Sequence, residues 1–170
     1  KVAQYDFNLK KSRDLIKESG VNVGARTIKL LSFPYGSAWD RLGEYTKQSL
    51  EQIGFKVEIV SVDAGGWAKR TGEFDFDLTF NFTYQYGDPA IGVARHYLST
   101  NIIKGSPFVN NQGYSNPAVD GLLTKGASTI DPVRRQQLYS EAQNILVNEV
   151  ANGFLFEIEY PTFYRNNVKN

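Results

Sequence analysis

Two helices in series, each opened by the same kind of start signal, constrain the fold of this chain most strongly. The signals are Asn116-Pro117 and Asp131-Pro132. An Asn or Asp at the N-cap accepts hydrogen bonds from free backbone N–H groups, and a proline at the first helical position loses no helical hydrogen bond. Beyond Asp131, apolar residues recur at helical spacing and predict one buried face, formed by Leu138, Tyr139, Ala142, Ile145, Leu146 and Val150.

Ahead of this pair, patterns typical of strands alternate with patterns typical of helices. The expected helices cover residues 6–19, 39–52, 66–71 and 88–97. The expected strands cover residues 27–33, 55–60, 74–86 and 154–160. Such alternation is typical of an α/β domain. Since 41% of the 170 residues are hydrophobic, enough for one core, we expect a single domain over residues 1–170.

The segment 74–86 alternates over its whole length. Its aromatic and leucine side chains fall on one side and its polar side chains on the other, as in a half-buried strand. Thirteen residues exceed an ordinary strand. We therefore expect the last few to form a loop that leaves the sheet.

The composition excludes several classes of function. The chain has no cysteine, which excludes disulfides, thiolate catalysis and cysteine metal sites. With His96 as its single histidine, we expect no metal site and no cofactor. Basic residues form no cluster, so no nucleic-acid partner is expected. The chain also has no methionine, even at position 1, and we expect it to be a piece of a larger protein.

Five motifs in collinear order resemble a known family. They are Ile53-Gly54-Phe55-Lys56-Val57, Gly72-Glu73-Phe74-Asp75, Gly87-Asp88-Pro89, Gly113-Tyr114-Ser115-Asn116-Pro117 and Asp131-Pro132-Val133-Arg134-Arg135. Together they resemble the C-terminal half of the dipeptide/oligopeptide/nickel class (family 5) of bacterial ABC-transporter solute-binding proteins. The resemblance covers nearly the whole chain.

The resemblance implies a periplasmic-binding-protein-like lobe, with a mixed β-sheet flanked by helices. The chain would be the second lobe of a two-lobed protein whose first lobe is absent from it. The two lobes would close over a small peptide-like or other polar solute and deliver it to ABC permease subunits, without catalysis. The protein would be periplasmic, or lipid-anchored outside the cytoplasm.

The same resemblance places the ligand at the loop that ends the segment 74–86, at about Phe82 to Pro89. The candidate contacts in this loop are Phe82, Tyr84, Gln85, Tyr86 and Asp88. Separately, Arg95 in the following short helix could reach an anionic group of the ligand or pair with a local carboxylate. Peptide-binding members carry an Asp where this chain has Gln85. A neutral Gln cannot form a charge-assisted bond to a peptide ammonium. Peptides, opines, sugars and nickel chelates therefore stay open as ligands, and the loop also fits a simple packing role.

Two alternatives come from the residues themselves. The pairs Asp75/Asp77 and Glu157/Glu159 each stand two apart on an expected strand, which places their carboxylates about 6–7 Å apart. That separation is compatible with a glycosidase-like hydrolase, although a solvated strand face gives the same pattern. The second alternative is a sensor or chaperone module built on the same lobe.

Overall fold

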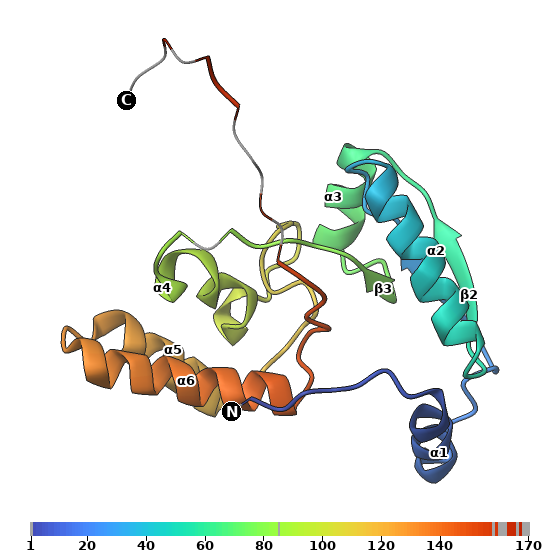
Figure 1. Ribbon diagram of the computed structural model, residues 1–170, viewed down its shortest axis with the longest axis horizontal. Helices are drawn as coiled ribbons and strands as arrows, with labels where there is room; N and C mark the ends of the chain where they lie inside the picture. The colour runs from blue at the N-terminus through green and yellow to red at the C-terminus, as the bar shows by residue number, and fades with distance from the viewer. Residues whose placement is uncertain (1, 85, 158, 160–162, 166, 168–170) are drawn as a thin grey trace.

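The computed structural model describes residues 2–84, 86–157, 159, 163–165 and 167 (Figure 1). Three parallel strands form one sheet in the order β2-β1-β3. Strand β1 (Thr27–Leu31) lies at the centre and pairs along its whole length with β2 (Lys56–Val60). Strand β3 (Leu78–Thr79) pairs only with the end of β1. The predicted α/β class is confirmed.

The helices of the first half follow their local signals. Helix α1 (Leu9–Ser19) begins after Asn8, whose side chain accepts from the Lys11 N–H, and ends at Gly20 with a φ of 68°. Helix α2 (Ser37–Glu51) joins β1 to β2. Helix α3 (Ala64–Gly72) joins β2 to β3 and is capped by the Asp63 side chain.

The second half is helical. Helix α4 (Pro89–Gly92) and the 3-10 turns η1 (Ala94–His96) and η2 (Ser99–Asn101) follow β3. Helices α5 (Pro117–Ser128) and α6 (Pro132–Asn148) then pack side by side (Figure 1). Among the described residues, no helix is long and apolar enough to cross a membrane.

Two buried clusters divide the molecule, and we name its halves after them. The sheet half, β1 to β3 with α2 and α3, packs around Leu30, Leu31, Phe33, Val57, Trp67 and Phe80. The hairpin half, α4 and η1 with α5 and α6, packs around Ala94, Tyr97, Val119, Leu123, Ala142 and Leu146. Val150 was expected on this buried face but is exposed, because α6 ends at Asn148 and the chain turns away with a φ of 50° at Val150.

The loop between η2 and α5 joins the two halves. The Gly105 N–H donates to the Gly72 carbonyl over 2.8 Å, and the buried Asn111 amide donates to the Thr71 carbonyl over 3.2 Å. Lys104 and Glu73 form an ion pair at 3.2 Å. These contacts fix the end of α3 against the loop.

Two strand predictions are wrong. Of the described residues in the segment 74–86, only Leu78 and Thr79 pair, because Thr79 is opposite Leu31, where β1 ends. The alternation also breaks there, since Leu78 is exposed and Thr79 half-buried. Residues 80–84 and 86 lie outside any strand, as expected for the last few residues of the segment, but the loop begins earlier than predicted.

The predicted last strand, 154–160, is also absent from the described residues. Residues 154–157 and 159 lie outside any strand, while Ile158 and Tyr160 are outside the described residues. A strand forms only against a partner, and the Phe156 ring instead lies 6.0 Å from that of Trp39. The mixed sheet is therefore not seen, and the described pairings are parallel.

Candidate ligand-binding site

The candidate site lies where β1 and β3 end side by side. Leu31 is paired with Thr79, so the chain leaves both strands at the same edge of the sheet. From β1 it turns through Pro34-Tyr35-Gly36 into α2, and from β3 it runs through residues 80–88 into α4. Ligand crevices in open α/β sheets form at such an edge, where neighbouring strands send the chain in different directions.

Five aromatic side chains line this edge, and we call them the aromatic row: Phe33, Tyr35, Phe82, Tyr84 and Tyr86. The ring of Phe33 lies 4.5 Å from that of Tyr35 and 5.6 Å from that of Phe82. The Tyr84 ring follows at 5.2 Å from Phe82, and the Tyr86 ring at 5.8 Å from Tyr84. Such centroid distances are those of favourable aromatic pairs.

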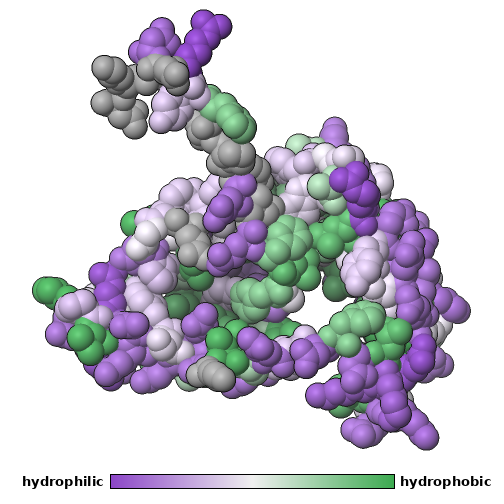
Figure 2. Space-filling model, in the orientation of Figure 1, coloured by the Kyte–Doolittle hydropathy of each residue, from purple (hydrophilic) through white to green (hydrophobic). Residues whose placement is uncertain are grey.

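The row runs from the core to the surface. Phe33 is fully buried and Phe82 half-buried, whereas Tyr35, Tyr84 and Tyr86 are 48%, 50% and 57% exposed. Figure 2 shows hydrophobic residues gathered around a hollow near the centre of one face of the molecule. The buried end holds the row in place, and the exposed tyrosines offer ring faces and hydroxyl groups to a ligand.

The structure thus brings together three of the predicted site residues, Phe82, Tyr84 and Tyr86. Gln85 lies outside the described residues. Sequence reasoning missed Tyr35. The signal was its position directly after a buried strand that neighbours the segment carrying Phe82.

The Asp88 carboxylate is already engaged within the protein. Oδ1 accepts from the Ala90 N–H over 2.9 Å and caps α4, while Oδ2 pairs with the Arg135 guanidinium of α6. The Ala90 hydrogen bond, together with Arg135, lowers the pKa of Asp88 below its ordinary value. Asp88 is therefore ionised near neutral pH, with both oxygens in use.

Gly92 lets the loop that carries Tyr84 and Tyr86 lie close to α4. An added Cβ on Gly92 would collide with the Tyr84 carbonyl oxygen and would lie 3.2 Å from the Tyr86 ring. Gly92 is buried in α4, directly under the loop. The loop can approach α4 this closely only because residue 92 has no side chain.

Arg95 and His96 lie in η1. The Arg95 Nε donates to His96 Nε2 over 3.3 Å, and among the described residues Arg95 forms no ion pair. His96 is 4% exposed. Burial, together with the Arg95 charge, lowers the pKa of His96 to about 4, so the imidazole is neutral and packs as part of the fold.

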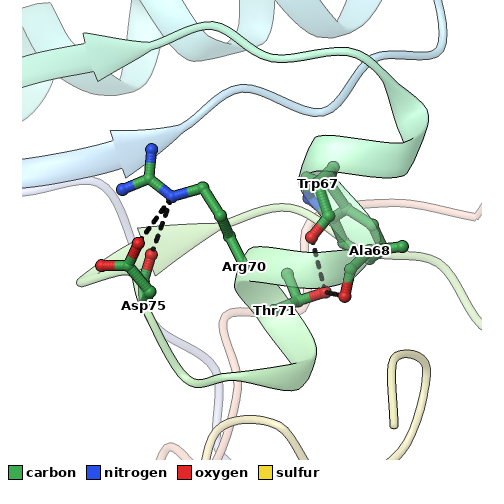
Figure 3. Close-up of polar contacts among 5 residues, drawn as sticks. All are labelled: Trp67, Ala68, Arg70, Thr71 and Asp75. Carbon is green, nitrogen blue, oxygen red and sulfur yellow. Dashed lines mark hydrogen bonds and ion pairs between the residues drawn. The ribbon is translucent and has the colours of Figure 1, made fainter. Parts of the chain in front are cut away.

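The carboxylate pairs that suggested a hydrolase are not arranged as an acid and a base. Asp75 pairs with Arg70 at 2.9 Å (Figure 3), and Asp77 pairs with Arg26 at 2.7 Å. The pKa of Asp77 is lowered, first by the hydrogen bond from the Lys29 N–H and then by Arg26, whereas a catalytic acid needs a raised pKa. Glu157 and Glu159 are exposed and outside any strand.

No group of three or more potential metal ligands occurs within the part of the chain that the structure describes. A pocket of about 150 Å³ lies between α2 and the sheet, where Trp39 and Glu44 contribute to its lining. Ligand pockets commonly enclose roughly 300–1,000 Å³, and a space of about 430 Å³ lies on the surface of α1 beside Asp14, Lys17 and Glu18, where none of the described aromatic residues lines it. The aromatic row is instead an open face, as one side of a cleft would be.

Residues 1–104 match the family model of the bacterial extracellular solute-binding proteins, family 5, in its middle region. The chain belongs to this family. Among curated family 5 relatives, the glutathione-binding protein GsiB of Escherichia coli K12 is 28% identical over 160 residues. The match covers 82% of this chain and 28% of GsiB.

Solved structures share the fold of this family 5 chain. HbpA2 of Haemophilus parasuis superposes with a TM-score of 0.79 at 24% identity, over 88% of this chain and 30% of that one. NikZ of Campylobacter jejuni, in complex with Ni(L-His), gives 0.77 at 16% identity, over 89% and 32%. DppA of Helicobacter pylori, in complex with the peptide STSA, gives 0.75 at 23% identity, over 88% and 28%. The chain thus spans less than a third of the length of these relatives.

Proposed function

We propose that this chain is one lobe of the substrate-binding component of an ABC import system. In this proposal the other lobe lies outside the 170 residues, and the two lobes close over a small peptide-like or other polar solute. The closed protein delivers the solute to permease subunits and performs no chemistry on it. Its compartment is the periplasm, or the outer face of the membrane if a lipid anchors it.

The observation that carries the proposal is the aromatic row in a family 5 chain. Tyr35, Tyr84 and Tyr86 expose rings at the sheet edge where α/β proteins bind ligands, and their rings pack back to the buried Phe33. An exposed tyrosine contributes contact area at a low cost in side-chain entropy, and its hydroxyl stays able to hydrogen-bond. The row suits a ligand with apolar or planar groups beside polar ones.

The charges near the row bear on the ligand class. Gln85 is neutral, and the carboxylate of Asp88 is occupied by α4 and Arg135. Neither therefore supplies a free carboxylate for the ammonium group of a peptide. The half-buried Arg95 is the first basic residue along the chain after Tyr86, and we propose that it contacts an anionic group of the ligand.

Ligand binding would act by shifting an equilibrium between open and closed forms. The closed form brings the other lobe over the row and buries both faces of the ligand, so the ligand stabilises it more than the open form. A single lobe offers one face only. Affinity should therefore belong to the whole two-lobed protein.

A thermal-shift screen of the full-length protein tests the proposal. The panel holds glutathione, the peptides Met-Leu and Ser-Thr-Ser-Ala, Ni(L-His), an opine and an oligosaccharide. A ligand at 100 times its dissociation constant should stabilise by about 2.7 kcal/mol. A panel without any hit on the full-length protein would contradict the proposed substrate classes, and a strong hit on the 170 residues alone would contradict the half-cleft.

A matched pair of tyrosine variants then places the ligand. Tyr84→Ala should weaken binding of the compound that gives a hit by about fivefold, the loss of roughly 1 kcal/mol of stacking. Tyr45→Ala is the control, because Tyr45 is similarly exposed but lies on α2 outside the row. Equal affinities for the two variants, measured by calorimetry, would remove the row from the site.

A further inference from the structure

We propose that Arg135 is a positioning residue for the ligand loop, by which we mean residues 80–84 and 86–88. Arg135 holds Asp88, the last residue of this loop, against α6 and so fixes the aromatic row for ligand. The inference rests on the proposed function, since it assigns a role at the same site. Arg135 itself would touch no ligand.

The first support is the meeting of two sequence motifs. Asp88 belongs to Gly87-Asp88-Pro89, and Arg135 is the last residue of Asp131-Pro132-Val133-Arg134-Arg135. The two residues are 47 positions apart and form an ion pair. The start signal explains why Asp131 and Pro132 stand where they do, because they open α6. The ion pair with Asp88 gives Arg135 of the same motif a role as well.

The second support is the setting of the pair. The side chains of Arg135 and Asp88 are only 32% and 28% exposed, so solvent and salt screen their attraction less than at an open surface. The Arg135 guanidinium also lies 5.8 Å from the centre of the Tyr139 ring, within the range of a cation–π contact. Since Tyr139 packs in the hairpin cluster, Arg135 is oriented by the body of the hairpin half.

The third support is the path from Asp88 to the row. Asp88 caps α4, a helix of four residues that has little stability by itself. Gly92, at the end of α4, lies directly under the Tyr84 carbonyl and the Tyr86 ring. Any shift of α4 relative to α6 therefore moves these two tyrosines, and the ion pair opposes that shift.

We call the ion pair between Arg135 and Asp88 the tether. Two substitutions separate the effect of the tether from the effect of Asp88 as the N-cap of α4. Arg135→Gln removes the charge at α6, and Asp88→Asn removes the charge at α4 but keeps a side-chain oxygen suited to the N-cap. Arg134→Gln is the matched control, because Arg134 is exposed and its guanidinium bonds Gln137 instead. If the tether acts as a unit, the double variant Asp88→Asn/Arg135→Gln should be no worse than either single variant.

The measurements are hydrogen exchange and affinity in the full-length protein, with glutathione and Met-Leu as probes. In Arg135→Gln, peptides covering residues 82–92 should exchange about tenfold faster while those of α5 keep their rates. The dissociation constant of a probe that binds should rise by about tenfold if the loop is competent in about a tenth of the molecules. Arg134→Gln should leave both quantities unchanged.

A purely structural role would give a different pattern, with exchange accelerated equally throughout the hairpin half and affinity unchanged. That pattern, or additive effects of Asp88→Asn and Arg135→Gln, would overturn the inference. Failure of the proposed function has a separate signature, because the wild-type protein would then bind neither these probes nor any compound of the panel. In that case unchanged exchange at residues 82–92 would also reject the tether.

Discussion

The sheet half and the hairpin half hold their elements together in different ways. The sheet half relies on apolar and aromatic contacts between segments far apart in the chain, such as the Phe33 ring against that of Trp67 at 5.1 Å. Its strands are short, and β3 contributes only Leu78 and Thr79. Without the nonlocal contacts, nothing in the local sequence would fix the end of β3.

The hairpin half adds polar caps to its core. The Asn116 side chain accepts from the N–H groups of Ala118 and Val119 at the start of α5, and it donates to Glu149 at the end of α6. The Tyr114 hydroxyl donates to the same carboxylate over 2.5 Å. Burial and this carboxylate raise the pKa of Tyr114 to about 12, so the donor stays protonated near neutral pH.

The difference shows why the candidate site lies where it does. The aromatic row comes from the sheet half, whose edge leaves rings exposed. The cap and the ion pair of Asp88 come from the hairpin half, which fixes the far end of the same loop. A packed core thus holds one end of this loop, and an ion pair holds the other. The rings of the row can therefore keep defined positions while they stay exposed.

The prediction with the largest expected effect tests whether the two halves unfold as one unit. Leu146→Ala removes a side chain that is 6% exposed in the hairpin core, and it should destabilise by about 2–5 kcal/mol. Both tryptophans of the chain, Trp39 and Trp67, lie in the sheet half. Because the loop between η2 and α5 joins the halves, we expect them to unfold together. Tryptophan fluorescence should then report the full destabilisation during urea unfolding of the 170-residue chain.

Leu15→Ala is the control for that experiment. Leu15 is 53% exposed on α1, and its truncation should change stability by less than about 0.5 kcal/mol. A fluorescence transition that does not move in Leu146→Ala, while the helical circular dichroism signal does, would show that the halves unfold separately. The comparison would then describe two independent units.

The next effect tests how tightly the hairpin is packed. A Cβ added to Gly126 would lie 2.7 Å from the Tyr139 ring, so Gly126→Ala should destabilise by about 1–3 kcal/mol. Gly121 lies on the same helix with no atom within 4 Å of an added Cβ. Gly121→Ala should therefore stabilise by about 0.4–1 kcal/mol. Thermal unfolding that moves both variants in the same direction would contradict the close contact of α5 and α6.

How far the sequence predicts each half follows from this contrast. The caps at Asn116 and Asp131 and the stop at Gly20 are local, and the structure confirms the helices that they predict. The family match over residues 1–104 confirms the family resemblance, which rests on five local motifs, two of which contain these caps. Alternation in 74–86 and 154–160 shows only that a segment suits a pleated surface, and it carries no information about the partner strand.

The same limit applies to the candidate site. The sequence pointed to Phe82, Tyr84 and Tyr86, and the structure places them in one row, although their contact with ligand stays a prediction. The position of Tyr35 after a buried strand was a signal that went unused, and no pattern in the sequence indicated that Arg135 pairs with Asp88. In both cases the contact joins residues 47 positions apart, which a pattern in one segment cannot encode.

The last effect is absent near neutral pH and concerns His96, which packs in η1 and bonds to the side chain of Arg95. Its pKa is about 4 in the folded protein because burial disfavours the charged imidazole, against 6.5 without that environment. Between these values the unfolded chain binds the proton and the folded chain does not, so stability falls as the pH drops from 6.5 toward 4. Above pH 6.5 the contribution is complete and nearly constant.

The histidine signal in a proton NMR titration checks this directly, because the 170-residue chain has one histidine. We expect its midpoint near pH 4 and no change around pH 6.5. His96→Gln should reduce the loss of stability between pH 6.5 and 4.5 in urea unfolding, with little difference from wild type at pH 7.5. A midpoint near 6.5 would mean that water reaches the imidazole. The packing of η1 against the loop between η2 and α5 would then be looser than the packing of the other elements in the hairpin half.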